Sequence, residues 1–121
     1  MERKLILLAS VSGGLAVILG ALGAHSLALK LEPRLLAIYE TGVRYQMYHA
    51  LALLAAAKMP RLTPKLLAIS GWSFLSGTVL FSGSLYLLTL TGKYWLGAIT
   101  PLGGLAFVFG WLCLARAAWK R

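Results

Sequence analysis

Four long apolar segments, each about long enough to cross a lipid bilayer, constrain this chain more than any other feature of its sequence. They lie at about residues 5–29, 36–57, 66–90 and 94–115. A helix rises about 1.5 Å per residue, so roughly 20 residues cross the ~30 Å hydrocarbon core. The run from Leu5 to Ala9 does not alternate apolar and polar residues, as a membrane β-barrel requires. The pattern predicts four transmembrane helices.

Composition and the breaks between these segments predict how the helices are connected. The chain has 121 residues, of which 60% are hydrophobic and 12% charged, whereas soluble domains carry about 25% charged residues. The breaks at about residues 30–34, 59–65 and 91–93 are short, so neighbouring helices should be antiparallel. We expect one all-α domain, residues 1–121, forming an up-down-up-down bundle. Thr63 is a candidate N-cap, and Pro33 and Pro64 suit first helical turns.

The N-terminal segment has an alternative interpretation as a cleaved signal peptide. Glu2-Arg3-Lys4 forms a charged start, and residues 21–24 are mostly small, as at a cleavage site. The apolar stretch is longer than the 7–15 residues typical of such peptides, and three further segments follow. We therefore expect the first helix to be retained.

The distribution of basic residues predicts the orientation in the membrane. One side holds eight of them: Arg3, Lys4, Lys58, Arg61, Lys65, Arg116, Lys120 and Arg121. The other side holds three: Lys30, Arg34 and Lys93. The positive-inside rule then places both termini in the cytoplasm. The net charge of +9 fits this role and an attraction to anionic membrane lipids. We expect no nucleic-acid partner, because no basic stripe carries interleaved stacking aromatics.

The second segment holds the candidate functional site, a polar cluster in an otherwise apolar chain. Its members are Glu40, Arg44, Tyr45, Gln46, Tyr48 and His49, with His25 from the first segment. Glu40, Arg44 and Tyr48 share a helical face, which predicts a Glu40–Arg44 ion pair inside a hydrogen-bonded network. Two interpretations stay open. The cluster is either a structural pair with tyrosines at the outer interface, or a polar chamber that opens outward.

Small residues recur at helical spacing and predict close helix packing. The positions are Ala16, Gly20, Ala24, Ser73, Gly77, Ser84, Gly103 and Gly104. These positions exceed what one bundle obviously needs, so assembly into a homo-oligomer is an alternative to packing within one chain. Pro101 is expected to kink the fourth helix a turn or two after its start.

The sequence predicts neither a metal site nor a cofactor. His25 and His49 are expected at different depths, which argues against a shared haem or metal ion. Cys113 is the only cysteine, so no internal disulfide can form. The sequence also lacks a nucleophile with a base and an orienting group, so we assign no catalytic residue.

At four motifs the chain resembles a known family. They are residues 20–25, 39–54, 80–86 and 97–104, which read GALGAH, YETGVRYQMYHALALL, LFSGSLY and GAITPLGG. They are similar to the signatures of the YgdD-like family of small bacterial inner-membrane proteins, although Ser26 replaces the usual glycine. The resemblance implies four spans in the bacterial plasma membrane and supplies no activity or catalytic residue.

Two classes of function follow from these observations. The first is a structural or interaction module that binds itself, lipid or a larger membrane complex. The second is a transporter or conducting protein that handles a proton or a small anion through Glu40, Arg44 and His49. An enzyme is a third alternative, and we do not expect one.

Overall fold

The computed structural model describes residues 2–119 and consists of four long helices. These are α1 (Glu2–His25), α2 (Pro33–Ala57), α3 (Pro64–Thr91) and α4 (Thr100–Trp119). Two short 3-10 helices, η1 (Leu27–Leu29) and η2 (Tyr94–Ala98), precede α2 and α4. This described part contains no strand, which confirms the all-α prediction with four helices. Lys120 and Arg121, counted among the basic residues of one side, lie outside the described residues.

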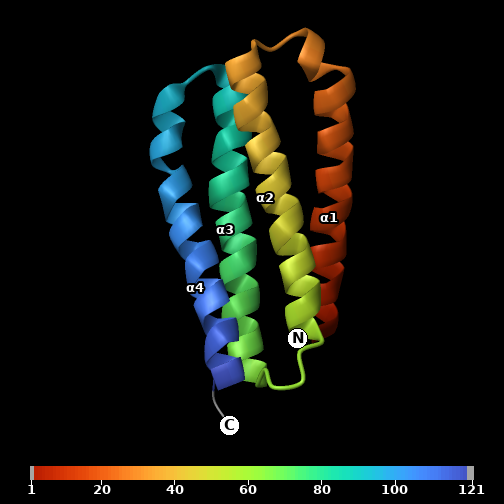
Figure 1. Cartoon of the computed structure of the whole chain (residues 1–121), viewed down its shortest axis with the longest axis vertical. Coiled ribbons are helices and arrows are strands. Elements are labelled where there is room, and N and C mark those ends of the chain that lie inside the picture. The colour runs from red at the N-terminus through yellow and green to blue at the C-terminus, as the bar shows by residue number, and fades with distance from the viewer. Residues whose placement is uncertain (1, 120–121) are drawn as a thin grey trace.

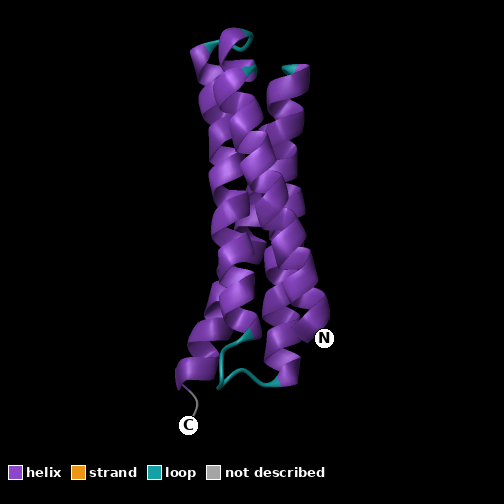
Figure 2. Cartoon of the chain, turned by 90° about the vertical axis from the view of Figure 1, so that its right-hand side faces the viewer, coloured by secondary structure: helices purple, strands orange, loops and turns teal. Residues whose placement is uncertain are grey.

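The helices stand side by side in chain order, as Figure 1 shows. Each packs against the next, and α1 and α4 form no comparable pair within residues 2–119. Consecutive helices run in opposite directions, so α1 begins and α4 ends at the same end of the molecule, here called the terminal end (Figure 1). Figure 2 shows the narrower side of the array, with loops only at its two ends. At the terminal end, Lys58 forms a salt bridge of 2.8 Å with Glu2.

Local sequence signals account for several helix ends. Thr63 caps α3, since its hydroxyl accepts a hydrogen bond of 3.2 Å from the backbone N–H of Leu66. Gly92 ends α3 with a φ of 73°, a conformation that favours glycine. The expected kink at Pro101 is wrong. The chain forms η2 first and starts α4 at Thr100, so Pro101 occupies the first turn, where no backbone donor is needed.

Aromatic rings packed on glycines set the spacing between neighbouring helices. Tyr86 of α3 lies over Gly42 of α2, where an added Cβ would meet the ring at 2.9 Å. Phe74 of α3 lies over Gly110 of α4, where the corresponding distance is 2.6 Å. Only a residue without a side chain admits rings this close, so these glycines fix how the helices pack.

The predicted packing residues are not all at contacts. Ala16, Gly77, Ser84 and Gly103 are buried, and a Cβ on Gly20 would lie 3.4 Å from Val43. Ser73 is half-buried, while Ala24 is exposed and Gly104 has no neighbour within 4 Å of an added Cβ. Ala24 therefore faces away from the other helices, and Gly104 lies beside the contact face because it is turned about 100° from the buried Gly103.

Three regions are long and apolar enough to cross a membrane. They are Glu2–Leu29, Pro64–Thr91 and Tyr94–Trp119. The helix α2 has 25 residues but is not among them. The polar residues from Tyr39 to His49, which lie around its middle, lower its hydropathy.

Candidate functional site

The predicted polar cluster is divided among separate places around α2. Two of its members, Gln46 and His49, are buried, whereas Glu40, Arg44 and Tyr48 are exposed. The division arises because successive helical positions differ by about 100°, so residues close in sequence face different neighbours. The members of the cluster therefore contact different residues, depending on the side of α2 on which they lie.

His49 lies in an aromatic pocket between α2, α3 and α4, which we call the His49 box. Its aromatic members are Tyr45, Phe74, Phe81, Phe107 and Trp111. The imidazole stacks on Phe107 with ring centroids 3.5 Å apart and only 5° between the planes. Its exposed fraction is 5%. The box therefore encloses a buried polar ring that reaches from α2 toward α4.

Both ring nitrogens of His49 have hydrogen-bond partners. The Trp111 indole is a donor only, and its Nε1 lies 3.0 Å from His49 Nε2. Nε2 must therefore be the acceptor, which assigns the proton to Nδ1. Nδ1 then donates to the backbone carbonyl of Tyr45 at 2.8 Å. The two partners together hold the imidazole neutral in a single tautomer.

Gln46 lies on a different face and forms the second polar group, which we call the Gln46 network. Its Nε2 donates to the backbone carbonyl of Ser12 at 2.9 Å. The hydroxyl of Tyr86 donates to Gln46 Oε1 at 2.6 Å. One amide thus links α1, α2 and α3. Beside it, the Ser82 hydroxyl donates to the carbonyl of Gly42 at 2.7 Å.

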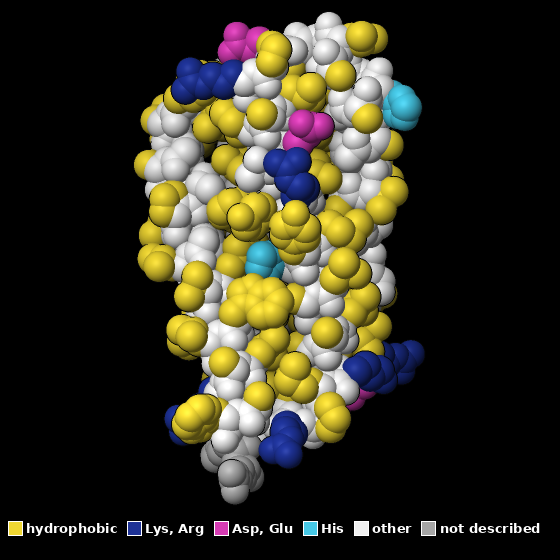
Figure 3. All heavy atoms as spheres, viewed as in Figure 1, with side chains coloured by type: hydrophobic (Ala, Val, Ile, Leu, Met, Phe, Trp, Pro, Cys, Tyr) yellow, Lys and Arg dark blue, Asp and Glu magenta, His cyan; other side chains and the backbone are white. Residues whose placement is uncertain are grey.

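The predicted Glu40–Arg44 ion pair is wrong. Arg44 donates to the Thr41 hydroxyl at 3.2 Å, and across residues 2–119 the only salt bridge joins Glu2 and Lys58. Exposure explains this result, because nothing packs over the two side chains to hold them together. Figure 3 shows acidic and basic side chains in the upper half of this face, above a broad hydrophobic belt.

His25 does not join the other candidates. It is the last residue of α1 and is exposed at the end opposite the termini. Tyr39, which also precedes the cluster in sequence, donates instead to the carbonyl of Leu19 on α1 at 2.5 Å. Within the described chain, no three His, Cys, Asp or Glu side chains gather as metal ligands would.

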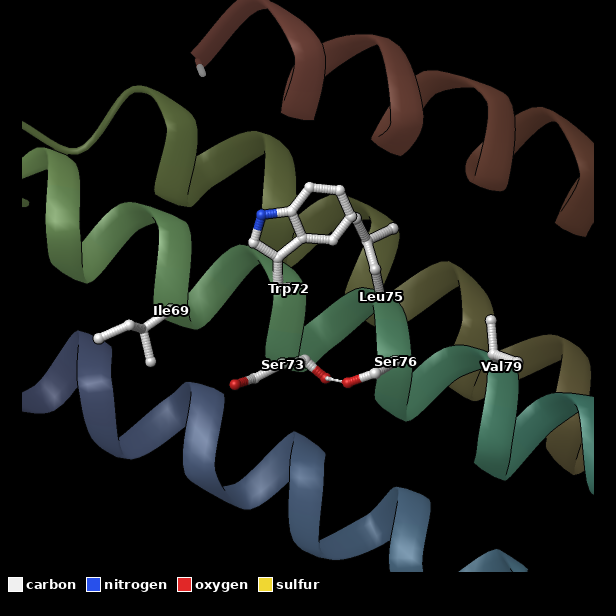
Figure 4. A pocket seen from close by; sticks show the side chains of 6 residues that line it. All are labelled: Ile69, Trp72, Ser73, Leu75, Ser76 and Val79. Atoms are coloured by element: carbon white, nitrogen blue, oxygen red, sulfur yellow. Dashed lines mark hydrogen bonds between the residues drawn. The ribbon is translucent and has the colours of Figure 1, made fainter.

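Two open hollows lie on the outer surfaces of α3. One, of about 460 Å³, lies along α3 itself, and Figure 4 shows its lining residues: Ile69, Trp72, Ser73, Leu75, Ser76 and Val79. Trp72 extends on the side of α1, where Lys4 Nζ lies 5.6 Å from its ring centroid. The other, of about 480 Å³, runs between α1 and α3 with Gln46 in its lining. Both are mainly apolar, as expected for surfaces that face lipid.

Sequence reasoning missed several partners of the site. Trp111 was not among the predicted cluster, yet its indole bonds His49 in the His49 box. Tyr86 and Ser82 belong to the motif at residues 80–86, but nothing in that motif indicated a partner on α2. The backbone carbonyl of Ser12 could not have been found, since only the packing of α1 on α2 brings it to Gln46.

The chain shares its sequence with bacterial membrane proteins along nearly its whole length. It is 48% identical over 123 residues to the UPF0382 membrane protein YwdK of Bacillus subtilis, with 98% of each chain covered. It is 44% identical to a UPF0382 membrane protein of Staphylococcus epidermidis, covering 98% of this chain and 97% of that protein. A UPF0382 membrane protein of Haemophilus influenzae is 41% identical, with 99% and 97% covered. No solved structure gives a significant match.

A family described as "Protein of unknown function (DUF423)" matches residues 19–104. That range holds all four motifs on which the resemblance was based. The relatives carry the UPF0382 name rather than the YgdD-like label that the motifs suggested. The chain therefore belongs to the DUF423 family, and it is a membrane protein of a family whose role is not characterised.

Proposed function

We propose that this protein is a structural or interaction module of the bacterial plasma membrane, built on four membrane-spanning helices. On this proposal its role is to bind membrane lipid, a larger membrane complex or further copies of itself. The observation that carries the proposal is the closure of its interior. Among the described residues, every buried side-chain nitrogen or oxygen has a hydrogen-bond partner within the chain.

The fourth span of this proposal is α2. Its 25 residues correspond to about 37 Å of helix, enough to cross the hydrocarbon core. It packs between α1 and α3, which meet the length and composition of a span. The polar side chains that lower its hydropathy include Gln46 and His49, and both are sheltered inside the array. A helix in this position crosses the bilayer together with its neighbours.

The proposed orientation places both termini in the cytoplasm. Arg3 and Lys4 begin α1 at the terminal end, and Arg61 and Lys65 flank the turn between α2 and α3 at that same end. Arg34 and Lys93 lie at the opposite end, where the guanidinium of Arg34 stands 4.8 Å from the ring centroid of Tyr94. The excess of basic residues at the terminal end supports this orientation.

Transport of a proton or a small anion has less support. A conducting path needs polar groups that can exchange partners with water or with the transported ion. His49 uses both nitrogens inside the chain, and Gln46 uses its oxygen and its nitrogen. Their atoms stabilise helix contacts and are not free to carry a substrate.

Reconstitution into lipid vesicles tests the proposal. We expect the proton and chloride leakage of these vesicles to match that of protein-free vesicles. We also expect the chain, when it is extracted from membranes, to be found in particles larger than one copy. A flux above the protein-free rate that falls when His49→Phe is introduced would overturn the module in favour of transport. A single-chain particle without any bound partner or tightly held lipid would also contradict it.

A further inference from the structure

One face of α2 is left open along most of its length. We call it the open stripe, and its residues recur at spacings of three or four: Ala37, Glu40, Arg44, Tyr48, Leu51 and Ala55. All six are exposed, and the exposed fractions of Tyr48 and Leu51 are 52% and 56%. Because α1 and α3 pack on other sides of α2, this spacing forms one continuous seam.

The open stripe carries charges that nothing in the described chain pairs. Glu40 and Arg44 lie about 10 Å and 16 Å along α2 from Pro33. Arg44 bonds only to its own neighbour Thr41, and Glu40 forms no salt bridge. The exposed faces of the other helices present apolar residues instead, such as Val17, Val79 and Val108. Charges at this depth normally face a partner rather than lipid.

We propose that the open stripe is where two copies of this chain associate, with Glu40 of each pairing with Arg44 of the partner subunit. This inference rests on the proposed function and names its partner. Two copies inserted in the same orientation are related by a two-fold axis along the membrane normal, so their α2 helices lie parallel. A stripe with both signs of charge is then complementary to itself.

The geometry of the stripe fits a helix of the same kind. Glu40 and Arg44 are four residues apart, about 6 Å along the axis, which a long arginine side chain can bridge to the facing helix. Ala37 and Ala55, near the two ends of the stripe, leave room for close approach. The spacings along the stripe average about 3.6 residues, one helical turn, so the six residues stay on one face that a second helix can meet along its length. Lipid headgroups would reach Arg44 only if its side chain extended to the interface.

A charge-swapped pair of variants tests the contact between copies. Glu40→Arg gives a stripe with two basic residues, and Arg44→Glu gives one with two acidic residues. We expect each variant alone to self-associate at least roughly eightfold more weakly than the native chain, since both symmetry-related pairs are lost and each polar contact between membrane helices is worth about 0.6 kcal/mol. Co-expressed with different tags, the two variants should associate with each other as the native chain does. If both variants keep the native unfolding midpoint and still do not associate with each other, the proposal is overturned.

Cysteine cross-linking tests the surface without altering the charges. In a Cys113→Ser background, which removes the only cysteine, Leu51→Cys should form a disulfide between copies in native membranes. Val17→Cys, on the exposed face of α1, is the matched control and should not. Cross-linking of Val17→Cys but not Leu51→Cys would overturn this surface while leaving a self-binding module intact. Flux across vesicles would instead contradict the proposed function as a structural or interaction module. Failure of the contact surface and failure of the proposed function therefore give different results.

Discussion

Trp111 Nε1 donates a hydrogen bond of 3.0 Å to His49 Nε2, joining α4 to α2 across 62 residues of sequence. The contact determines which nitrogen of the imidazole carries its proton, because the indole can only donate. It also ties the edge helix α4 to α2, with which it is not consecutive. The His49 box is therefore a stabilising contact as well as an enclosure for a polar ring.

Removing either partner of this hydrogen bond should destabilise the fold. Trp111→Phe leaves His49 Nε2 without its donor and should lower the free energy of unfolding by about 0.6–1.7 kcal/mol, the range for hydrogen bonds between membrane helices. His49→Phe should cost a similar amount. The double variant should lose less than the sum, since two apolar rings leave no unpaired polar group. Thermal unfolding in detergent measures these effects, with the exposed Trp95→Phe as a control.

The Gln46 network should contribute in the same way at the junction of α1, α2 and α3. Tyr86→Phe removes the donor to Gln46 Oε1 and keeps the ring over Gly42. We expect a loss of about 0.6 kcal/mol or more in unfolding free energy. Tyr94→Phe changes an exposed phenol and should have no measurable effect. Equal unfolding midpoints for both variants would show that the Tyr86 hydroxyl is not bound to Gln46.

Two adjacent glycines of α4 offer a matched test of helix packing. A Cβ on Gly103 would stand 2.8 Å from the carbonyl oxygen of Gly77 and would also collide with the backbone nitrogen of Phe81. Gly103→Ala should therefore destabilise the fold by about 1–3 kcal/mol. Gly104→Ala meets nothing within 4 Å and should be neutral, or stabilising by up to about 1 kcal/mol. The reverse order of stability would contradict the observed packing of α3 on α4.

Helix number and several helix ends could be predicted from sequence because their causes are local. Apolar length predicts helices, and the Thr63–Pro64 pair marks the start of α3. Pro101 misled the prediction of α4. A proline kinks a helix only if the helix has already begun, and here η2 comes first and α4 starts at Thr100. Whether residues 94–99 form an α or a 3-10 turn depends on how they close the end of the array.

The division of the polar cluster could not be predicted, because it depends on which helices flank α2. The spacing of Glu40 and Arg44 permits an ion pair, but both side chains are exposed and no neighbouring residue holds them together. Tyr45 and His49 were expected to join a network with His25, and instead they face Phe81 and Phe107 from α3 and α4. Such contacts join residues dozens of positions apart, which one sequence does not reveal.

Reporter fusions test the proposed orientation. A reporter that is active only in the cytoplasm should be active when fused after Arg121. The same reporter inserted at Gly92, in the turn at the opposite end of the array, should be inactive. Activity at both sites, or only at Gly92, would contradict cytoplasmic termini and an even number of spans.

The central claim is that the polar groups inside this protein are closed on one another. The nitrogen NMR spectrum of the His49 side chain in lipid bilayers at neutral pH tests it most directly. We expect one protonated nitrogen, Nδ1, and one unprotonated nitrogen, Nε2, in a single tautomer. Trp111→Phe should keep the proton on Nδ1, because the Tyr45 carbonyl still accepts from it, and should shift the Nε2 signal as that nitrogen loses its hydrogen-bond donor. A native spectrum that already shows a protonated Nε2, or rapid proton exchange with water, would contradict it.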